Sequence, residues 1–291
     1  MAPHTPQPLG SAPAEPWRSS MEAAAAARVT LILGANDTGK TTLVTHLASA
    51  LAERGDAVAV VDADLGQSDV GPPTTVGLGL VRRPIATLGE AELVGLEFLG
   101  TTSPARCMRE TGEATARLVA RALEAGCARV VVDTSGLVEG DFGLALKRIK
   151  IDRVRPDLLI ALQRRDECEP ILRLYEGRAA IVRLPAAAAG RRSPAERRRR
   201  RQRALAAHLA GAVPVTLDLM RVSARPAPSG RGLAVVEALG ALVGLEADGR
   251  TRGLGWVSAL DVGKARLTVE TAVDAEGISG VAIGRERYQA A

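Results

Sequence analysis

The chain has 291 residues, with 38 lysines and arginines against 33 acidic side chains and a formal net charge of +5. Apolar residues make up 46% of the sequence but aromatic residues only 2%, so we expect a core of Leu, Val, Ala and Ile. No stretch is long and apolar enough to span a bilayer, and three scattered cysteines fit neither a disulfide framework nor a zinc site. These features indicate a cytoplasmic protein with reduced thiols and an anionic partner, and they speak against a membrane protein.

The first 22 residues contain no predicted element of the fold. They are rich in Pro, Ala and Ser and lack the apolar core of a signal peptide. A segment of this composition buries too little apolar surface to order itself, so we expect a disordered tail over residues 1–22.

A phosphate-binding loop follows the first predicted strand. Residues 29–33 are apolar and uncharged, and the helix predicted over residues 43–53 carries a leucine on every fourth position of one face. The residues between them match G-x-x-x-x-G-K-[ST], in which backbone N–H groups and a helix N-terminus bind phosphate. In this motif Lys40 reaches the β- and γ-phosphates of a nucleoside triphosphate, and the Thr41 hydroxyl binds Mg²⁺. The predicted nucleotide-binding residues are Gly34, Ala35, Asn36, Asp37, Thr38, Gly39, Lys40, Thr41 and Thr42.

Three carboxylates follow two further predicted strands. Asp62 and Asp64 come after the buried strand at residues 57–61, and Asp133 ends the strand at residues 130–132. Ligands bind beyond the carboxyl ends of strands in an open α/β sheet. One carboxylate can organise the Mg²⁺ shell and another can take a proton from an attacking hydroxyl. Asp62 and Asp64, expected on one face of a continuing strand, compete for these roles with Asp133, the Walker B position.

Residues 69–104 are predicted to be rich in loops, with one short strand near their end. The loop before Pro104 contains Thr102 and Ser103, whose hydroxyls could contact phosphate or sugar, or cap the following helix. Beyond it, helical and apolar segments alternate as far as residue 184. This alternation predicts a parallel sheet with helices on both faces.

Residues 190–205 contain a dense arginine run. Ser193 and Glu196 form a capping-box pattern, so the run is predicted to be a helix. Arg197 and Arg201 lie four residues apart and are expected to share one helical face. Such a helix can close as a lid whose guanidinium groups stabilise a transferring phosphoryl group, or it can be a solvated basic surface.

Residues 211–291 have a different composition, with short apolar segments and frequent glycines that predict the hairpins of a small β-domain. Only Trp256 and Tyr288 are available there as stacking platforms for nucleic acid, so we expect a mainly structural role. The predicted organisation is therefore a P-loop domain over residues 23–210, followed by a β-rich domain over residues 211–291.

Together these motifs resemble the polynucleotide 5′-hydroxyl kinase family, which contains RNA-processing 5′-kinases and their archaeal and bacterial relatives. The P-loop, the D-x-D-x-G-Q pattern at residues 62–67, the Thr–Ser–Pro loop and the lid arginines occur in the family's order. The resemblance covers about residues 28–288. The chain departs from the pattern at Leu137, where eukaryotic members often have a tryptophan that clasps the terminal nucleotide.

The resemblance implies transfer of the γ-phosphate of ATP or GTP to the 5′-OH of RNA or DNA, with Mg²⁺ as the metal. It implies catalytic roles for Lys40, Asp62, Asp64, Arg197 and Arg201. It implies metal binding by Thr41, Asp64 and Asp133, and substrate binding by Gln67, Thr102, Ser103 and Arg192.

Two other functions remain open, an RNA-processing scaffold that binds a nucleotide without turnover and a kinase of a small-molecule acceptor. A scaffold has no physical need for the lysine, the carboxylates and the arginines that this chain carries. A GTPase switch is disfavoured because Ile149 stands where the N-K-x-D guanine-binding motif has its Asn. The sequence does not distinguish RNA from DNA, or ATP from GTP.

Overall fold

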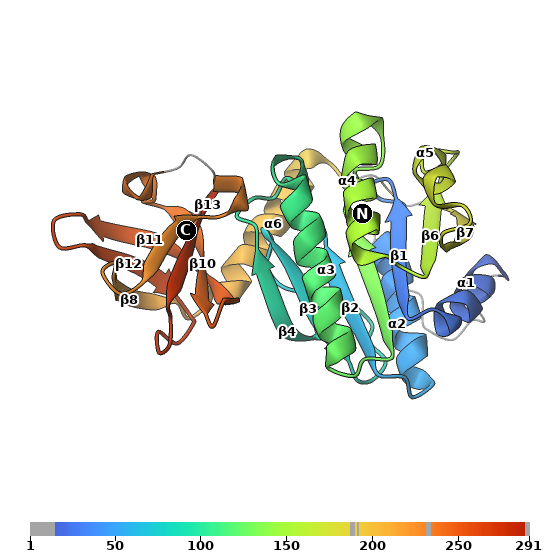
Figure 1. Ribbon diagram of the computed structural model, residues 1–291, viewed down its shortest axis with the longest axis horizontal. Coiled ribbons are helices and arrows are strands. Elements are labelled where there is room, and N and C mark those ends of the chain that lie inside the picture. Colours follow the sequence, from blue (N-terminus) through green and yellow to red (C-terminus); the bar gives the residue numbers. More distant parts are fainter. Residues whose placement is uncertain (1–14, 187–189, 191, 231–233, 289–291) are drawn as a thin grey trace, which may run out of the picture.

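Five parallel strands form the centre of the fold (Figure 1). The structure is a computed structural model and describes residues 15–186, 190, 192–230 and 234–288. Most of these strands are runs of Val, Leu, Ile and Ala buried on both faces, as a sheet covered on both sides requires. In the order β7-β6-β1-β5-β2, they are Ala180–Pro185, Leu158–Gln163, Val29–Gly34, Arg129–Thr134 and Val58–Ala63. The predicted α/β sheet is confirmed.

Helices cover both faces of this sheet, also as predicted. The helices α1 (Glu15–Ala26) and α2 (Lys40–Glu53) pack on one face, and α3 (Met108–Glu124) and α4 (Gly140–Val154) pack on the other. The short helix α5 (Glu169–Leu172) follows β6. In Figure 1, α3 and α4 lie in front of the strands. Within the described residues, no helix is long and apolar enough to cross a membrane.

Helix α1 corrects the expectation of a disordered tail. Residues 15–22 are helical, and the helix buries Ala24 and packs Trp17 and Met21 against the core on the α2 side of the sheet. The segment is rich in alanine, which favours helix, and tertiary packing supplies the remaining stability. Residues 1–14 of the predicted tail lie outside the described residues.

The sheet continues through two antiparallel strands that the sequence did not predict in full. Strands β3 (Thr75–Val81) and β4 (Glu92–Phe98) extend it beyond β2. The expectation of a loop-rich segment over residues 69–104 is therefore wrong for β3. The glycines of β3 made its sequence look unlike a strand. Gly77 and Gly79 are needed there because a Cβ at either position would collide with Val70.

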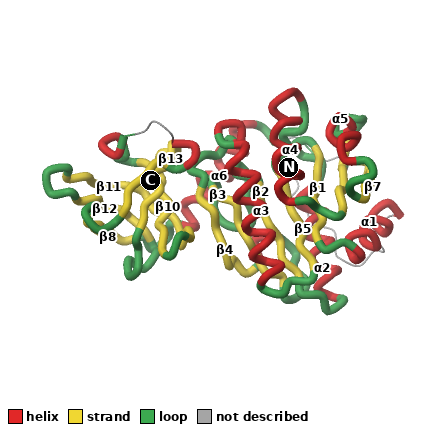
Figure 2. Tube along the Cα trace, viewed as in Figure 1, coloured by secondary structure: helices red, strands yellow, loops and turns green. Residues whose placement is uncertain are grey.

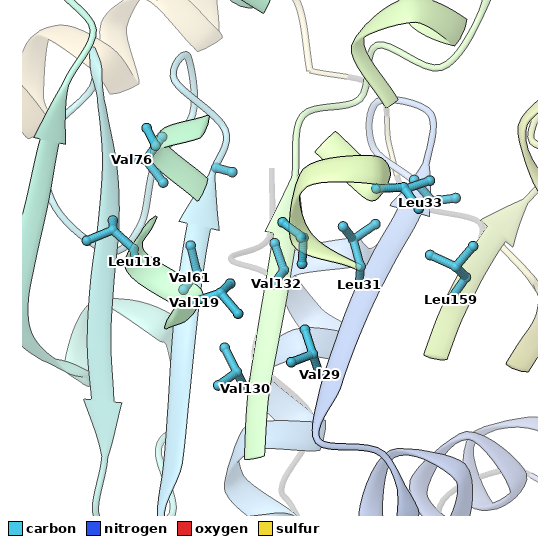
Figure 3. Close-up of a cluster of buried hydrophobic side chains, with 14 of the residues drawn as sticks. Val29, Leu31, Leu33, Val61, Val76, Leu118, Val119, Val130, Val132 and Leu159 are labelled. Atoms are coloured by element: carbon cyan, nitrogen blue, oxygen red, sulfur yellow. The ribbon is translucent and has the colours of Figure 1, made fainter. Parts of the chain in front are cut away.

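The core lies on the two faces of the central strands. Figure 3 shows valines and leucines of β1, β5, β2 and β6 side by side, with Leu118 and Val119 of α3 packed against them. The strands β1, β5 and β2 pair in parallel, so their carboxyl ends lie at one edge of the sheet. That edge carries the residues of the site described below.

The C-terminal residues form the predicted β-rich domain, which Figure 2 shows as a separate group of strands beyond β4. Helix α6 (Pro194–His208) leads into it. The strands are β8 (Val213–Asp218), β9 (Ser223–Pro226), β10 (Ala241–Ala247), β11 (Arg250–Asp261), β12 (Arg266–Thr271) and β13 (Gly280–Arg287). Strand β11 pairs with β4 at Thr251 and Leu96, so one continuous sheet runs through both domains.

Candidate functional site

The P-loop connects β1 to α2 in a conformation that depends on its two glycines. Gly39 has a φ of 92°, in the left-handed region that favours glycine. A Cβ on Gly34 would lie 2.5 Å from the carbonyl oxygen of Leu162 on β6. Lys40 is only 7% exposed and crosses the loop, where its Nζ donates to the carbonyl oxygen of Ala35 at 2.7 Å. Burial lowers the pKa of Lys40 below its ordinary value, and the nearby carboxylates oppose this effect.

The predicted metal residues Thr41 and Asp133 are in direct contact. The Thr41 hydroxyl donates to Asp133 Oδ2 at 2.7 Å. Burial raises the pKa of Asp133, while Lys40 and the Thr41 hydrogen bond oppose the rise. Hydroxyl and carboxylate oxygens are the ligands that Mg²⁺ prefers in proteins, so the residues present fit this metal.

The two aspartates of the D-x-D-x-G-Q pattern have different surroundings. Strand β2 ends at Ala63, so the expectation that Asp62 and Asp64 share a face of a continuing strand is wrong. Asp62 is 1% exposed and accepts hydrogen bonds from the backbone N–H groups of Asp64, Asp69 and Val70. Burial, with Asp133 beside it, raises the pKa of Asp62. The carboxylate of Asp62 therefore organises the following loop, which argues against its predicted role in catalysis.

Asp64 instead lines the cavity next to the P-loop. Its Oδ1 accepts from the backbone N–H groups of Gly66 and Gln67, at 3.0 and 3.1 Å. Gln67 Nε2 donates to the carbonyl oxygen of Gly66 at 2.6 Å and to that of Arg197 at 3.3 Å. The loop that fixes Asp64 is thus also linked to α6.

Helix α6 begins as predicted. Ser193 Oγ accepts from the Glu196 backbone N–H at 3.2 Å, and Glu196 Oε2 accepts from the Ser193 backbone N–H at 2.6 Å. This capping box fixes the first turn beside the P-loop. Residue 191, within the predicted lid, lies outside the described residues.

Arginines of α6 contact the two loops of the site. Arg197 Nη2 donates to Asp37 Oδ2 at 2.6 Å, and the Arg192 backbone N–H donates to the same oxygen. Burial raises the pKa of Asp37, but these contacts outweigh it and hold the pKa below its ordinary value. Arg200 pairs with Asp69 in the loop after β2. The helix is therefore bound to the P-loop at one point and to the D-x-D-x-G-Q loop at another.

The structure brings Arg197 into the site but does not place Arg201 beside it. Arg192, Arg197 and Arg200 line the cavity, whereas Arg201 is absent from its lining. The prediction paired Arg197 with Arg201, four positions apart, but the face of α6 that lines the cavity carries Arg197 and Arg200, three positions apart. The i, i+3 spacing of Arg197 and Arg200 was the signal in the sequence.

These residues surround a cavity of about 150 Å³ at the carboxyl edge of the sheet. The lining includes seven of the nine predicted P-loop residues, together with Asp64, Gln67 and three arginines. It consists of Asn36, Asp37, Thr38, Gly39, Lys40, Thr41, Thr42, Asp64, Gln67, Gly190, Arg192, Arg197 and Arg200. The cavity combines an anion-binding loop and helix N-terminus with cationic side chains, and it can bind a polyphosphate.

A larger cavity, of about 600 Å³, lies between α4 and the segment after β6. Five carboxylates line it, from residues 139, 141, 166, 167 and 169, against two arginines at 165 and 173. It shares no lining residue with the phosphate-binding cavity. Its charge would repel a polyphosphate, so we assign phosphate binding to the smaller cavity.

Two buried lysines of α4 bind the ends of the strands that carry Asp62 and Asp133, and neither lysine was among the predicted site residues. Lys147 Nζ donates to Thr134 Oγ1 at 3.0 Å and also to the carbonyl oxygen of Ser135. Lys150 Nζ donates to the carbonyl oxygen of Ala63 at 3.1 Å. Both lysines are 0% exposed, and burial lowers the pKa of each, for Lys150 to about 8. They tie α4 to the ends of β5 and β2, where the carboxylates stand.

Two further residues fix the P-loop from outside the motif. Arg164, after β6, donates from Nη2 to the carbonyl oxygens of Asp37 and Asn36, at 2.7 and 3.2 Å. A Cβ on Gly136 would collide with Asn36, so only glycine fits where the segment after β5 meets the loop. Neither contact could be read from the sequence, because each joins residues about 100 or more positions apart.

The predicted substrate residues Thr102 and Ser103 lie outside the phosphate-binding cavity. The backbone N–H and the hydroxyl of Thr102 both donate to Glu286 of β13, at 3.1 Å. Ser103 precedes the turn at Pro104–Arg106, and its side chain makes no capping hydrogen bond. The β-domain therefore holds this loop, which also packs against Gly66.

Comparison with known proteins identifies relatives of this chain. It is 39% identical over 149 residues to a polyribonucleotide 5′-hydroxyl-kinase of Pyrococcus furiosus, an alignment that covers 50% of this chain and 41% of that protein. It is 37% identical over 151 residues to a protein of the same name from Methanocaldococcus jannaschii, covering 52% and 41%. The matched part thus spans about two fifths of the length of these curated relatives.

The fold is also that of a known structure. The wild-type Clp1p–Pcf11p complex contains a chain that superposes with a TM-score of 0.69 at 13% identity, over 89% of this chain and 74% of that one. The family model described as mRNA cleavage and polyadenylation factor CLP1 P-loop matches residues 34–211, more than half of the chain. This segment contains the P-loop, the D-x-D-x-G-Q loop, Asp133 and the arginine helix, and the resemblance seen in the sequence is confirmed. The chain belongs to the CLP1 P-loop family.

Proposed function

We propose that this protein transfers the γ-phosphate of ATP or GTP to the 5′-hydroxyl of a polynucleotide. The observation that carries the proposal is one cavity in which a P-loop, Asp64 and three arginines of one segment meet. Relatives that match half of the chain bear the name polyribonucleotide 5′-hydroxyl-kinase, which supports a nucleic acid acceptor. The net charge of +5 fits the same partner.

The P-loop residues bind the triphosphate in this proposal. Backbone N–H groups between Gly34 and Thr42 and the N-terminus of α2 hold the phosphate oxygens. Lys40 moves its Nζ from the Ala35 carbonyl oxygen to the β- and γ-phosphates. Thr41 and Asp133 would hold Mg²⁺, which neutralises charge on the transferred group.

Asp64 is the general base. It lines the cavity beside Lys40, and within the part of the chain that the structure describes, backbone N–H groups bind its Oδ1 alone, at 3.0 and 3.1 Å. The carboxylate accepts the proton of the acceptor hydroxyl as that oxygen attacks the γ-phosphorus atom and the bond to the bridging oxygen breaks. Arg197 and Arg200 line the same cavity from α6, and in this proposal their guanidinium groups stabilise the charge on the transferring group.

The experiment is transfer of labelled γ-phosphate, with Mg²⁺, to matched RNA and DNA oligonucleotides that end in a 5′-hydroxyl. Lys40→Ala is the control, and oligonucleotides with a 5′-phosphate are the second control because they offer no acceptor. We expect label on the 5′-hydroxyl oligonucleotides alone, and none with Lys40→Ala.

A chain that binds ATP but labels neither oligonucleotide would refute the proposal. Label on a small alcohol such as a free nucleoside, with none on the oligonucleotides, would instead assign a small-molecule acceptor. Binding of ATP and of RNA without transfer would assign the scaffold role.

A further inference from the structure

A second cavity adjoins the phosphate-binding cavity along the outer side of α2. Its volume is about 520 Å³, and it shares Thr41, Thr42 and Arg200 with the phosphate-binding cavity. Trp17 of α1 and His46 of α2 form part of its wall. Cavities of roughly 300–1,000 Å³ are typical of small-molecule sites, and none of the roles proposed above uses this one.

Two aromatic rings line this cavity. The rings of Trp17 and His46 meet edge to face, with centroids 5.4 Å apart and an interplanar angle of 63°. An edge-to-face contact uses one face of one ring only, so neither ring is covered on both faces by its partner. The chain has only two tryptophans, and an indole face stacks well on a planar heterocycle.

His46 brings an unsatisfied polar atom to the same place. Its Nε2 is buried and has no hydrogen-bond partner within the part of the chain that the structure describes. Burial lowers the pKa of His46, so the imidazole is neutral at pH 7 and can donate or accept one hydrogen bond at Nε2. Buried polar atoms are rarely left unpaired, so this atom indicates a ligand with a polar edge.

We propose that this cavity binds the nucleoside of the phosphoryl donor, with the base against Trp17 and its polar edge at His46. The inference rests on the proposed function, which supplies a nucleoside triphosphate as the donor. The phosphate-binding cavity, at about 150 Å³, is too small for a nucleoside as well as phosphates. A nucleoside attached to phosphates in that cavity therefore extends into a neighbouring space, and the second cavity adjoins it at Thr41, Thr42 and Arg200. The acidic cavity between α4 and α5 shares no wall with it.

Tryptophan fluorescence tests this assignment directly. Trp256 packs against Tyr288 in the β-domain, so Trp256→Phe leaves Trp17 as the single tryptophan without touching the site. This variant is titrated with ATP and with inorganic tripolyphosphate, each with Mg²⁺. We expect ATP to change the Trp17 emission and tripolyphosphate to leave it nearly unchanged, although both bind. An equal response to both ligands, or no response to ATP at saturation, would overturn the proposal.

Calorimetric titration of Trp17→Leu gives the second test, with Trp256→Leu as the matched control. Loss of one stacking partner should weaken ATP binding by about tenfold. Binding of tripolyphosphate should stay the same in both variants, because the P-loop is intact. An equal loss for ATP and tripolyphosphate in Trp17→Leu would mean that Trp17 is only structural and would overturn the inference. Both tests measure binding alone. Absence of phosphoryl transfer would therefore refute the proposed function without refuting the nucleoside site.

Discussion

Replacement of Arg197 by alanine should damage phosphoryl transfer far more than folding. Arginines that stabilise a transferring phosphoryl group contribute about 10³–10⁵-fold to kcat. Arg192 and Arg200 line the same cavity and retain part of the charge, so we expect a loss of about 10³-fold, or about 4 kcal/mol of transition-state stabilisation. The ion pair with Asp37 has an arginine 26% exposed, so its loss should cost only about 1–2 kcal/mol of unfolding free energy.

The assay is single-turnover transfer of labelled phosphate at saturating ATP and oligonucleotide, with urea unfolding measured in parallel. Arg198→Ala is the matched control, because it removes the same charge from an exposed neighbouring position on α6. The control should keep its rate within about twofold, since exposed charges contribute little. Equal losses in the two variants, or a loss in Arg197→Ala that saturating ATP restores, would refute the transition-state role.

Three further results follow from the geometry of the site. Arg200→Ala should slow transfer at least tenfold more than Arg201→Ala under the same assay, because only the first lines the cavity. Asp64→Asn should lower kcat by about 10²–10⁴-fold with ATP affinity kept, and an equal loss in Asp62→Asn at unchanged stability would return the role of base to Asp62. The pKa of Lys150 is lowered to about 8 from 10.5, so between these pH values the unfolded chain binds more protons at this residue than the folded chain. The free energy of unfolding therefore increases as the pH rises through this window. Lys150→Met should remove about 3 kcal/mol of that increase, which urea unfolding at both ends of the window would measure. An equal pH dependence of the unfolding free energy in Lys150→Met and in the unchanged protein would disprove this.

Two buried lysines, Lys40 and Lys150, also explain how the site carries several carboxylates in a small volume. Asp62 and Asp133 stand opposite each other on neighbouring strands, and both are nearly fully buried. Their mutual repulsion raises the free energy of the folded state unless positive charge lies close by. Lys40 supplies it from the P-loop, and Lys150 supplies it from α4.

The sequence by itself determined the features that depend on neighbouring residues. The P-loop, the strand that carries Asp133 near its end and the capping box of α6 are local patterns, and each was found where it was predicted. Their order along the chain also gave the α/β fold, because short connections leave few topologies for alternating strands and helices. The C-terminal β-domain followed from composition in the same way.

Only the tertiary structure decided how these patterns meet. The separation of Asp62 from Asp64 depends on β2 ending at Ala63 and on a loop that folds back to satisfy one carboxylate. The choice of Arg200 over Arg201 depends on which side of α6 faces that loop. The burial of Lys150 depends on α4 covering the ends of two strands. Each outcome is set by contacts between residues far apart in the chain, and a local pattern contains no information about which partner lies across such a contact.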